Sequence, residues 1–205
     1  STLQQNPDSN NGTGRILLVG TSYVLNYANN TSNQPCFRAI TVSGVTPTVG
    51  SELTFAAGSQ TSYFASYVYS SSILVHISAS ATLLYAVPIS VSGTTLTQGT
   101  QATTTTTGFN SVSGSLSSNR IAVGFINSGL YGAIVSVAGT TASISSVLLT
   151  GNVTASPNMY MQVFGLQAVI VASQTTSANE AVVLTDNAGT AVAGATAAAA
   201  LFLLI

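Results

Sequence analysis

The sequence repeats a short glycine-centred motif three times and carries a degenerate fourth copy. The copies are Ile40–Thr46 (ITVSGVT), Ile89–Thr95 (ISVSGTT), Val135–Thr141 (VSVAGTT) and Val183–Thr190 (VLTDNAGT). Their glycines, Gly44, Gly93, Gly139 and Gly189, are spaced by 49, 46 and 50 residues. Self-similarity at a period of about 20 to 50 residues indicates a fold built from stacked supersecondary units.

Each copy predicts a β-hairpin. Glycine adopts the positive φ that a two-residue hairpin turn requires without steric cost. The Val and Thr residues around it are β-branched, which disfavours a helix and suits a pleated strand. We therefore expect a strand, a tight turn at the glycine and a second, Thr-rich strand in every unit.

Two further elements precede each hairpin. The first is an apolar run, typical of a strand buried on both faces: Ile16–Gly20, Ile73–Ile77, Ile121–Phe125 and Ala168–Ala172. The second is a weaker alternating stretch before three of these runs: Tyr63–Tyr69, Phe109–Leu116 and Tyr160–Leu166. The prediction is an all-β protein with about four short strands in each unit.

Units of this size match the blades of β-propellers, which run to about 40 to 50 residues. We expect residues 1–14 to form an N-terminal arm and residues 15–205 one repeat-built domain, with units at roughly 11–57, 58–106, 107–152 and 153–205. The first unit lacks an obvious opening strand, and the apolar segment Ala197–Ile205 is expected to supply it by closing a four-bladed propeller. A β-sandwich is the alternative architecture.

The composition excludes several functions. Only 3% of the 205 residues are charged, and three Arg without any Lys cannot neutralise a run of phosphates, so no nucleic-acid binding is expected. One Cys and one His do not make an ordinary zinc site, and no metal or cofactor is expected. In place of charges, 29 Ser and 28 Thr supply the polar surface.

The two ends of the sequence carry no targeting signal that we recognise. The polar N-terminal residues lack the basic and apolar regions of a signal peptide. The apolar run Ala191–Ile205 is 15 residues long, whereas a membrane-spanning helix needs about 20. A buried strand is the preferred interpretation of this run, and no membrane insertion is expected.

Two single residues and one turn are candidates for a catalytic or metal-binding site. His76 lies inside an apolar run, where an interior histidine is favoured over an acid–base catalyst. Cys36 has Arg38 nearby, which would lower its pKa if the two were close in space, but a buried thiol is favoured. The Asp186–Gly189 segment offers one carboxylate where calcium loops supply several, so we predict a turn. No catalytic residue is assigned.

Two surface features remain. The run Thr103–Thr107 is predicted to be the outer strand of the second unit. Tyr63, Tyr67 and Tyr69 alternate so as to share one side of a strand, with Phe64 on the other. Exposed Tyr rings stack on sugars, which predicts a receptor or glycan contact, and packing of the rings between blades is the alternative.

The segment Val91–Gly99 (VSGTTLTQG) and the stretch 112–141 resemble the repeats of bacteriophage tail-fibre and other virion β-propeller proteins. In those repeats a strand ending in Leu-Ser-Ser precedes an apolar strand and a VSGTT-type hairpin. The resemblance covers two units well and the outer two loosely. It implies a virion structural or adsorption role and transfers no catalytic or ligand-binding residue.

These observations predict a non-enzymatic virion protein, either a tail or head fibre or a capsid decoration, that attaches to a host surface or glycan. The alternative is a secreted or cell-surface adhesive or filament-forming module, located outside the cell. Low net charge favours association, so we expect a homo-oligomer, a trimer if fibre-like. The polar arm 1–14 is expected to fix it to other virion proteins.

Overall fold

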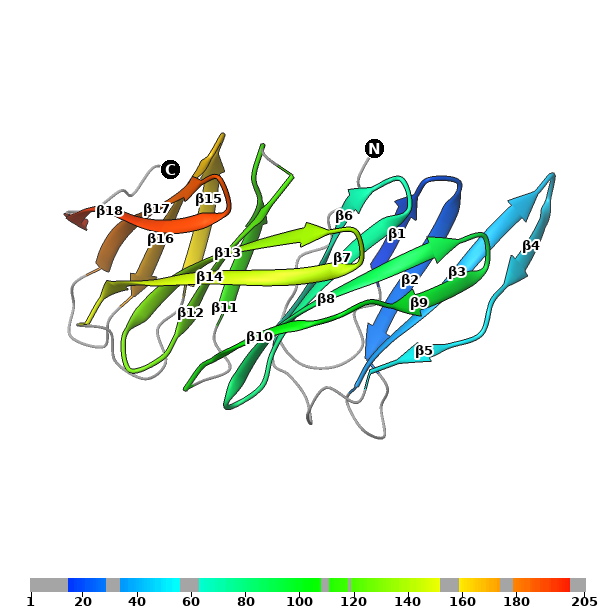
Figure 1. Cartoon of the computed structure of the whole chain (residues 1–205), viewed down its shortest axis with the longest axis horizontal. Helices are drawn as coiled ribbons and strands as arrows, with labels where there is room; N and C mark the ends of the chain where they lie inside the picture. Colours follow the sequence, from blue (N-terminus) through cyan, green and yellow to red (C-terminus); the bar gives the residue numbers. More distant parts are fainter. Residues whose placement is uncertain are drawn as a thin grey trace. The chain divides into compact units, whose positions relative to one another are not determined.

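The computed structural model describes residues 15–28, 34–55, 63–107, 111–117, 119–151, 159–173 and 179–199. These residues form 18 strands in four antiparallel sheets and no helix (Figure 1). The all-β fold and its division into four repeats are therefore confirmed. No described segment is a helix that is long and apolar enough to cross a membrane. The expected arm, residues 1–14, lies outside the described residues.

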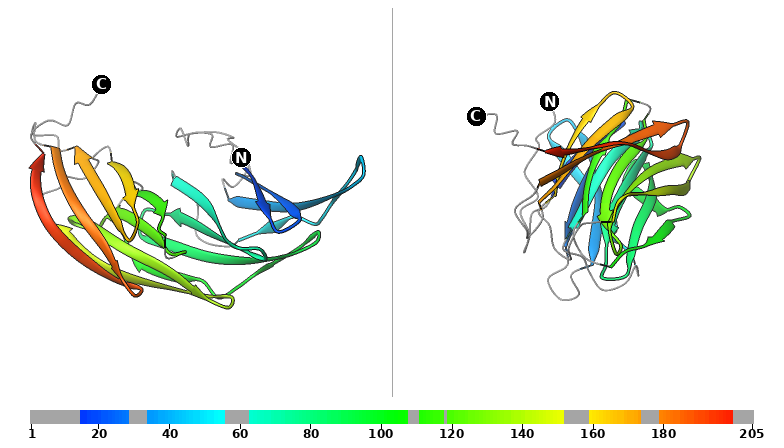
Figure 2. Two further views of the ribbon diagram at one scale, coloured as in Figure 1. Left: turned by 90° about the horizontal axis from the view of Figure 1, so that it is seen from above. Right: turned by 90° about the vertical axis from the view of Figure 1, so that its left-hand side faces the viewer.

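Each sheet is built from one repeat, and its first four strands form an antiparallel meander (Figures 1 and 2). Sheet 1 holds β1 (Arg15–Val19), β2 (Ser22–Ala28), β3 (Pro35–Ser43), β4 (Thr46–Val49) and β5 (Leu53–Thr54). Sheet 2 holds β6 (Tyr63–Ser70), β7 (Ile73–Ala79), β8 (Leu83–Ser92), β9 (Thr95–Gln98) and β10 (Ala102–Thr105). Sheet 3 holds β11 (Ser111–Ser115), β12 (Ile121–Ile126), β13 (Leu130–Ala138) and β14 (Thr141–Thr150). Sheet 4 holds β15 (Met159–Phe164), β16 (Gln167–Ser173), β17 (Asn179–Asn187) and β18 (Thr190–Ala199). In sheets 1 and 2 a fifth strand pairs with the third strand beside the fourth, as β5 does with β3 and β10 with β8.

The glycine-centred motifs form the predicted hairpins between the third and fourth strands. Gly44, Gly93 and Gly139 occupy the first position of two-residue loops with φ of 61°, 57° and 61°. Positive φ at that position alone is the signature of a type II′ turn. The fourth hairpin differs, because Ala188 (φ 51°) and Gly189 (φ 95°) are both left-handed, as in a type I′ turn.

The first repeat opens differently from the prediction. Ile16–Val19 is not a strand buried on both faces but part of the opening edge strand β1, on which Ile16 is 63% exposed. The buried neighbour is β2, which the sequence did not reveal because its apolar residues alternate with Ser and Asn. The first three residues of the predicted closing strand, 197–199, belong to β18 and pair with β17 in sheet 4. Residues 200–205 of the predicted closing strand lie outside the described residues.

The other predicted strands lie where expected, with one difference in burial. The runs 73–77 and 121–125 form β7 and β12, whose side chains are buried on both faces apart from the half-buried Ile73. The run 168–172 forms part of β16, which instead alternates: Ala168 and Ile170 are buried, while Val169 and Val171 are half-buried. The Thr-rich run includes β10, an edge strand of sheet 2 as predicted.

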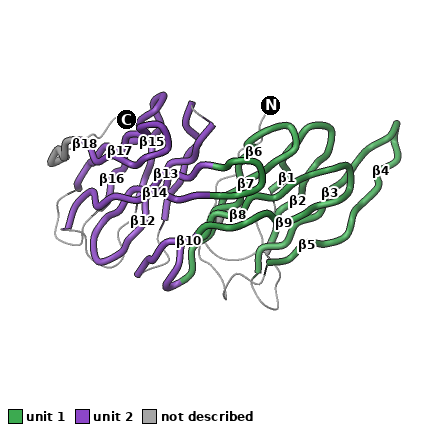
Figure 3. Tube along the Cα trace, viewed as in Figure 1, with its two compact units in different colours: residues 1–80, 85–102, 137–142 green, residues 81–84, 103–136, 143–205 purple. Residues whose placement is uncertain are grey.

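The chain divides into two compact units (Figure 3). Unit 1 comprises residues 1–80, 85–102 and 137–142, and unit 2 comprises residues 81–84, 103–136 and 143–205. In unit 1, sheet 1 packs on the β6–β7 face of sheet 2 through Phe37, Phe55 and His76. In unit 2, sheets 3 and 4 enclose an aliphatic core that includes Ile134, Ile170 and Leu184.

Candidate functional site

The one histidine lies in the core of unit 1, within a polar cluster of three side chains. His76 is in the middle of β7, and the antiparallel register places Ser66 of β6 directly opposite it. The Ser66 hydroxyl lies 3.0 Å from His76 Nδ1, and Asn26 Nδ2 of β2 donates to Ser66 Oγ over 2.7 Å. The Ser66 oxygen thus accepts a hydrogen bond from Asn26 and forms a second one with His76 Nδ1.

Apolar burial determines the chemistry of this cluster. His76 is 0% exposed, and the rings of Phe37 and Phe55 lie with centroids 5.1 and 5.9 Å from its ring. Burial disfavours the imidazolium and lowers the pKa of His76 to about 3. The histidine is therefore neutral at physiological pH.

A serine hydrogen-bonded to a histidine is also the core of a nucleophilic site. Here Ser66 is 4% exposed, and both side chains lie between two packed sheets. A substrate could reach the hydroxyl only if the sheets separated. The cluster therefore matches the predicted interior histidine, and its role is to join β2, β6 and β7.

A second cluster lies on the outer side of sheet 1. Tyr27 donates a short hydrogen bond to Glu52, Arg38 Nε donates to the Tyr27 hydroxyl over 3.1 Å, and Arg38 Nη2 lies 3.4 Å from Glu52 Oε2. The Tyr27 hydrogen bond lowers the pKa of Glu52 and raises that of Arg38. The pKa of Tyr27 is raised, first by burial and then by the hydrogen bond to Glu52.

Cys36 lies opposite Tyr27 in the register of β2 and β3. Its side chain is buried, and Sγ lies 3.5 Å from the carbonyl oxygen of Gln34. Arg38, the residue considered as its activator, uses its guanidinium to bind Tyr27 and Glu52. The structure thus agrees with the prediction of a buried thiol.

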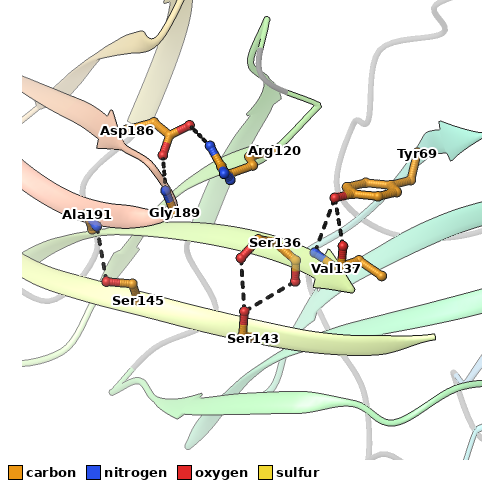
Figure 4. Close-up of polar contacts among 9 residues, drawn as sticks. All are labelled: Tyr69, Arg120, Ser136, Val137, Ser143, Ser145, Asp186, Gly189 and Ala191. Atoms are coloured by element: carbon orange, nitrogen blue, oxygen red, sulfur yellow. Dashed lines mark hydrogen bonds and ion pairs between the residues drawn. The ribbon is translucent and has the colours of Figure 1, made fainter. Parts of the chain in front are cut away.

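The third cluster ties the last hairpin of unit 2 to the start of β12 (Figure 4). Asp186 Oδ2 lies 2.9 Å from Arg120 Nη1, and Oδ1 accepts a hydrogen bond of 2.7 Å from the backbone N–H of Gly189. The Asp186 side chain is 0% exposed. Both carboxylate oxygens thus hold the turn, as predicted for Asp186–Gly189, and the described segments contain no group of three His, Cys, Asp or Glu that could hold a metal.

The predicted glycan-contact residues lie on β6. Tyr67 and Tyr69 are both half-buried. The Tyr69 hydroxyl donates to the carbonyl oxygen of Val137 over 2.9 Å and also lies 3.4 Å from the Val137 nitrogen (Figure 4). The side chain of Tyr63 lies outside the described residues. Sugar stacking by Tyr67 and Tyr69 stays a prediction, and the hydroxyl of Tyr69 is tied to the backbone.

Sequence reasoning identified His76 and Asp186 but not their partners. The Ser66–His76 pair could not be found from the β6–β7 turn alone, because the register shifts by one residue between Val68 and Ser70. The roles of Arg120 and Asn26 could not be predicted from neighbouring residues, because the hydrogen-bond partner of each lies in a different sheet. Known protein families, curated proteins and solved structures were all compared with this chain, and none of them matches it.

Proposed function

We propose that the chain is a non-enzymatic structural protein of a virion, a tail or head fibre or a capsid decoration, that contacts a host surface or glycan. The observation that carries the proposal is that the three polar clusters, at His76, Arg38 and Asp186, all tie strands of the scaffold together. Side chains that are hydrogen-bonded between strands stabilise the fold and are not available to bind a substrate.

The amino-acid sequence of the repeated motif supports the proposed virion role. The hairpins at Gly93 and Gly139, which carry the resemblance to virion repeat proteins, have type II′ turns between antiparallel strands. Such sheets present a dense Ser and Thr surface with almost no charge. A surface of this kind suits permanent contact with neighbouring subunits, because it lacks the repulsion that keeps soluble proteins apart.

The arm is proposed to fix the chain to the particle. Residues 1–14 (STLQQNPDSNNGTG) contain too few apolar residues to build a core of their own. They would order on binding to another virion protein. A chain that begins at Arg15 should therefore keep the β-sheet circular dichroism spectrum and lose its incorporation into particles.

The place where the protein is found distinguishes a virion protein from a secreted or cell-surface module. We expect mass spectrometry of density-gradient fractions to find this chain with nucleic-acid-containing particles. Recovery only from cell surfaces or secreted filaments would replace the virion assignment with the adhesive or filament-forming alternative. Normal particle incorporation of the chain that begins at Arg15 would exclude attachment through the arm.

A further inference from the structure

The four sheets differ in how many of their faces are covered. In sheet 3, every side chain of the inner strand β12 is buried, so both faces are covered. In sheet 1, β2 alternates between buried residues such as Val24 and exposed or half-buried residues such as Tyr23. In sheet 4, β16 alternates in the same way. Among the described residues of each unit, sheets 1 and 4 therefore each have one face that no other sheet covers, which is called the free face below.

The free face of sheet 1 carries a row of apolar side chains. Register places Leu18 opposite Tyr23, Tyr23 opposite Ile40 and Ile40 opposite Val49, so these four side chains form one row across the sheet. Leu18 is 55%, Tyr23 42% and Val49 54% exposed, and Ile16 and Val42 on the same face are 63% and 50% exposed. Adjacent exposed apolar side chains of this kind mark an interaction site.

The free face of sheet 4 carries a row of apolar side chains as well. Tyr160 lies opposite Val171, and Val171 opposite Ala181, in a second row. Tyr160 is 69% exposed, Phe164 on the same face is 60% exposed, and Val171 and Ala181 are half-buried. On both faces the exposed apolar side chains lie beside polar ones, which are Arg38 and Glu52 on sheet 1 and Gln162, Gln167 and Thr185 on sheet 4.

The two free faces correspond to the two sides of a contact that exists within unit 2. The Tyr160–Val171–Ala181 row of sheet 4 is equivalent to Val112–Gly124–Gly132 of sheet 3, which packs against sheet 4. The Leu18–Tyr23–Ile40 row of sheet 1 is equivalent to Val163–Ala168–Leu184 of sheet 4, which packs against sheet 3. The free face of sheet 4 is therefore equivalent to the face of sheet 3 that sheet 4 covers, and the free face of sheet 1 is equivalent to the face of sheet 4 that sheet 3 covers.

We propose that the free face of sheet 4 docks on the free face of sheet 1 of a second copy of this chain. The contact is head-to-tail and reproduces, between chains, the packing of sheet 3 on sheet 4. The free face of sheet 1 carries two charged side chains, Arg38 and Glu52, which form an ion pair. Their charges cancel, so the face has no net charge that would oppose the contact. The inference rests on the sheet faces and holds whether or not the virion assignment is right.

The test uses two variants of the full chain, one for each face. Leu18→Glu and Tyr160→Glu place a charge on the free faces of sheets 1 and 4, at side chains that are more than half exposed, so both variants should fold. Val45→Glu is the matched control, because Val45 is 97% exposed but lies in the β3–β4 turn and not on a sheet face. Circular dichroism and the thermal midpoint check that all three are folded.

Sedimentation velocity over a hundredfold concentration range measures the outcome. The unmodified chain and Val45→Glu should associate, and each face variant alone should weaken association at least tenfold. A mixture of the two face variants should form a 1:1 dimer, because the mixture still contains one intact face of each kind.

Three results would overturn the proposal. If only one variant blocks association, the contact pairs two identical faces. If the unmodified chain is monomeric throughout, the free faces are covered by the chain itself, either by its own end segments or by each other. If both variants associate like the control, the contact lies elsewhere.

Discussion

The cores of the two units are built from equivalent positions that hold very different side chains. In unit 1 the row Arg15–Asn26–Phe37 lies on the face that packs against sheet 2. The equivalent row in unit 2 is Val112–Gly124–Gly132, which packs against sheet 4. One row holds a charge, an amide and a large ring, and the other holds one small apolar side chain and two glycines.

The same sheet arrangement is therefore reached by two kinds of packing. Unit 1 fills the space between its sheets with aromatic rings and a hydrogen-bonded polar cluster around His76. Unit 2 uses glycines, and Leu184 lies so close to Gly132 that a Cβ atom there would be 2.7 Å from Leu184 Cδ1. Both units share the hairpin turns and the alternating strands, and we infer that these features determine the sheet structure. The side chains that fill the core can then differ between the units.

The largest effect is expected from a cavity in the close-packed core of unit 2. Leu184→Ala removes a fully buried side chain from a core with no polar group to relax around it, which should lower the free energy of unfolding by about 2 to 5 kcal/mol. Leu148→Ala is the control, because Leu148 is 48% exposed and its loss should cost less than about 1 kcal/mol. Urea denaturation followed by circular dichroism measures both. Equal effects would mean that Leu184 is not a core residue.

The charged pair at the edge of the unit 2 core should give the next effect. Asp186→Ala removes the partner of Arg120 and the acceptor for the Gly189 N–H, at a cost of about 2 to 3 kcal/mol. Asp186→Asn keeps an acceptor oxygen and should cost about half as much. If the two variants are equally stable, the hydrogen bond to the turn contributes nothing.

The buried imidazole in the core of unit 1 should make the stability of the protein depend on pH. Folding lowers the pKa of His76 from 6.5 to about 3, so the unfolded chain binds one more proton between these values and stability falls as the pH drops below 6.5. The loss is about 1.4 kcal/mol per pH unit, or about 2 kcal/mol at pH 5, and it ends near pH 3.

His76→Gln is the variant that isolates this effect, because it keeps a polar side chain opposite Ser66 that does not titrate. Urea denaturation at pH 7 and pH 5 should show a smaller loss of stability for the variant than for the unmodified chain. The same loss in both proteins would show that the acid sensitivity comes from carboxylates such as Glu52, whose pKa is also lowered in the folded state.

The features that could be predicted from sequence are those with a local cause. Positive φ at Gly44, Gly93 and Gly139 follows from the turn itself, so the hairpins and the four repeats could be predicted. The burial of Ile16–Val19 could not, because a short apolar run looks the same whether one or both of its faces are covered. In the structure one face of β1 is exposed, with Ile16 at 63% and Leu18 at 55%.

The candidate site was predicted less completely for the same reason. A lone His76 in an apolar run indicates an interior histidine, but its hydrogen-bond partners depend on strand register and on which sheet packs above it. The pairing of Asn26 with Ser66 joins residues 40 positions apart, and that of Arg120 with Asp186 joins residues 66 apart. No spacing rule within a strand or a turn links them.

The smallest effect tests whether the hairpins, and not the core contents, specify the sheets. Gly93→Ala puts a Cβ atom on a residue with φ of 57°, where an L-residue is strained, although no atom lies within 4 Å of the new Cβ. The cost should therefore be purely conformational, about 1 to 2 kcal/mol. Gly151→Ala is the control, since its Cβ also meets no atom within 4 Å and its φ is not positive, so its effect should stay within about 0.5 kcal/mol. Urea denaturation measures both variants. If Gly93→Ala is as harmless as Gly151→Ala, the turn tolerates any residue, and the motif that defines the repeat has another cause than backbone conformation.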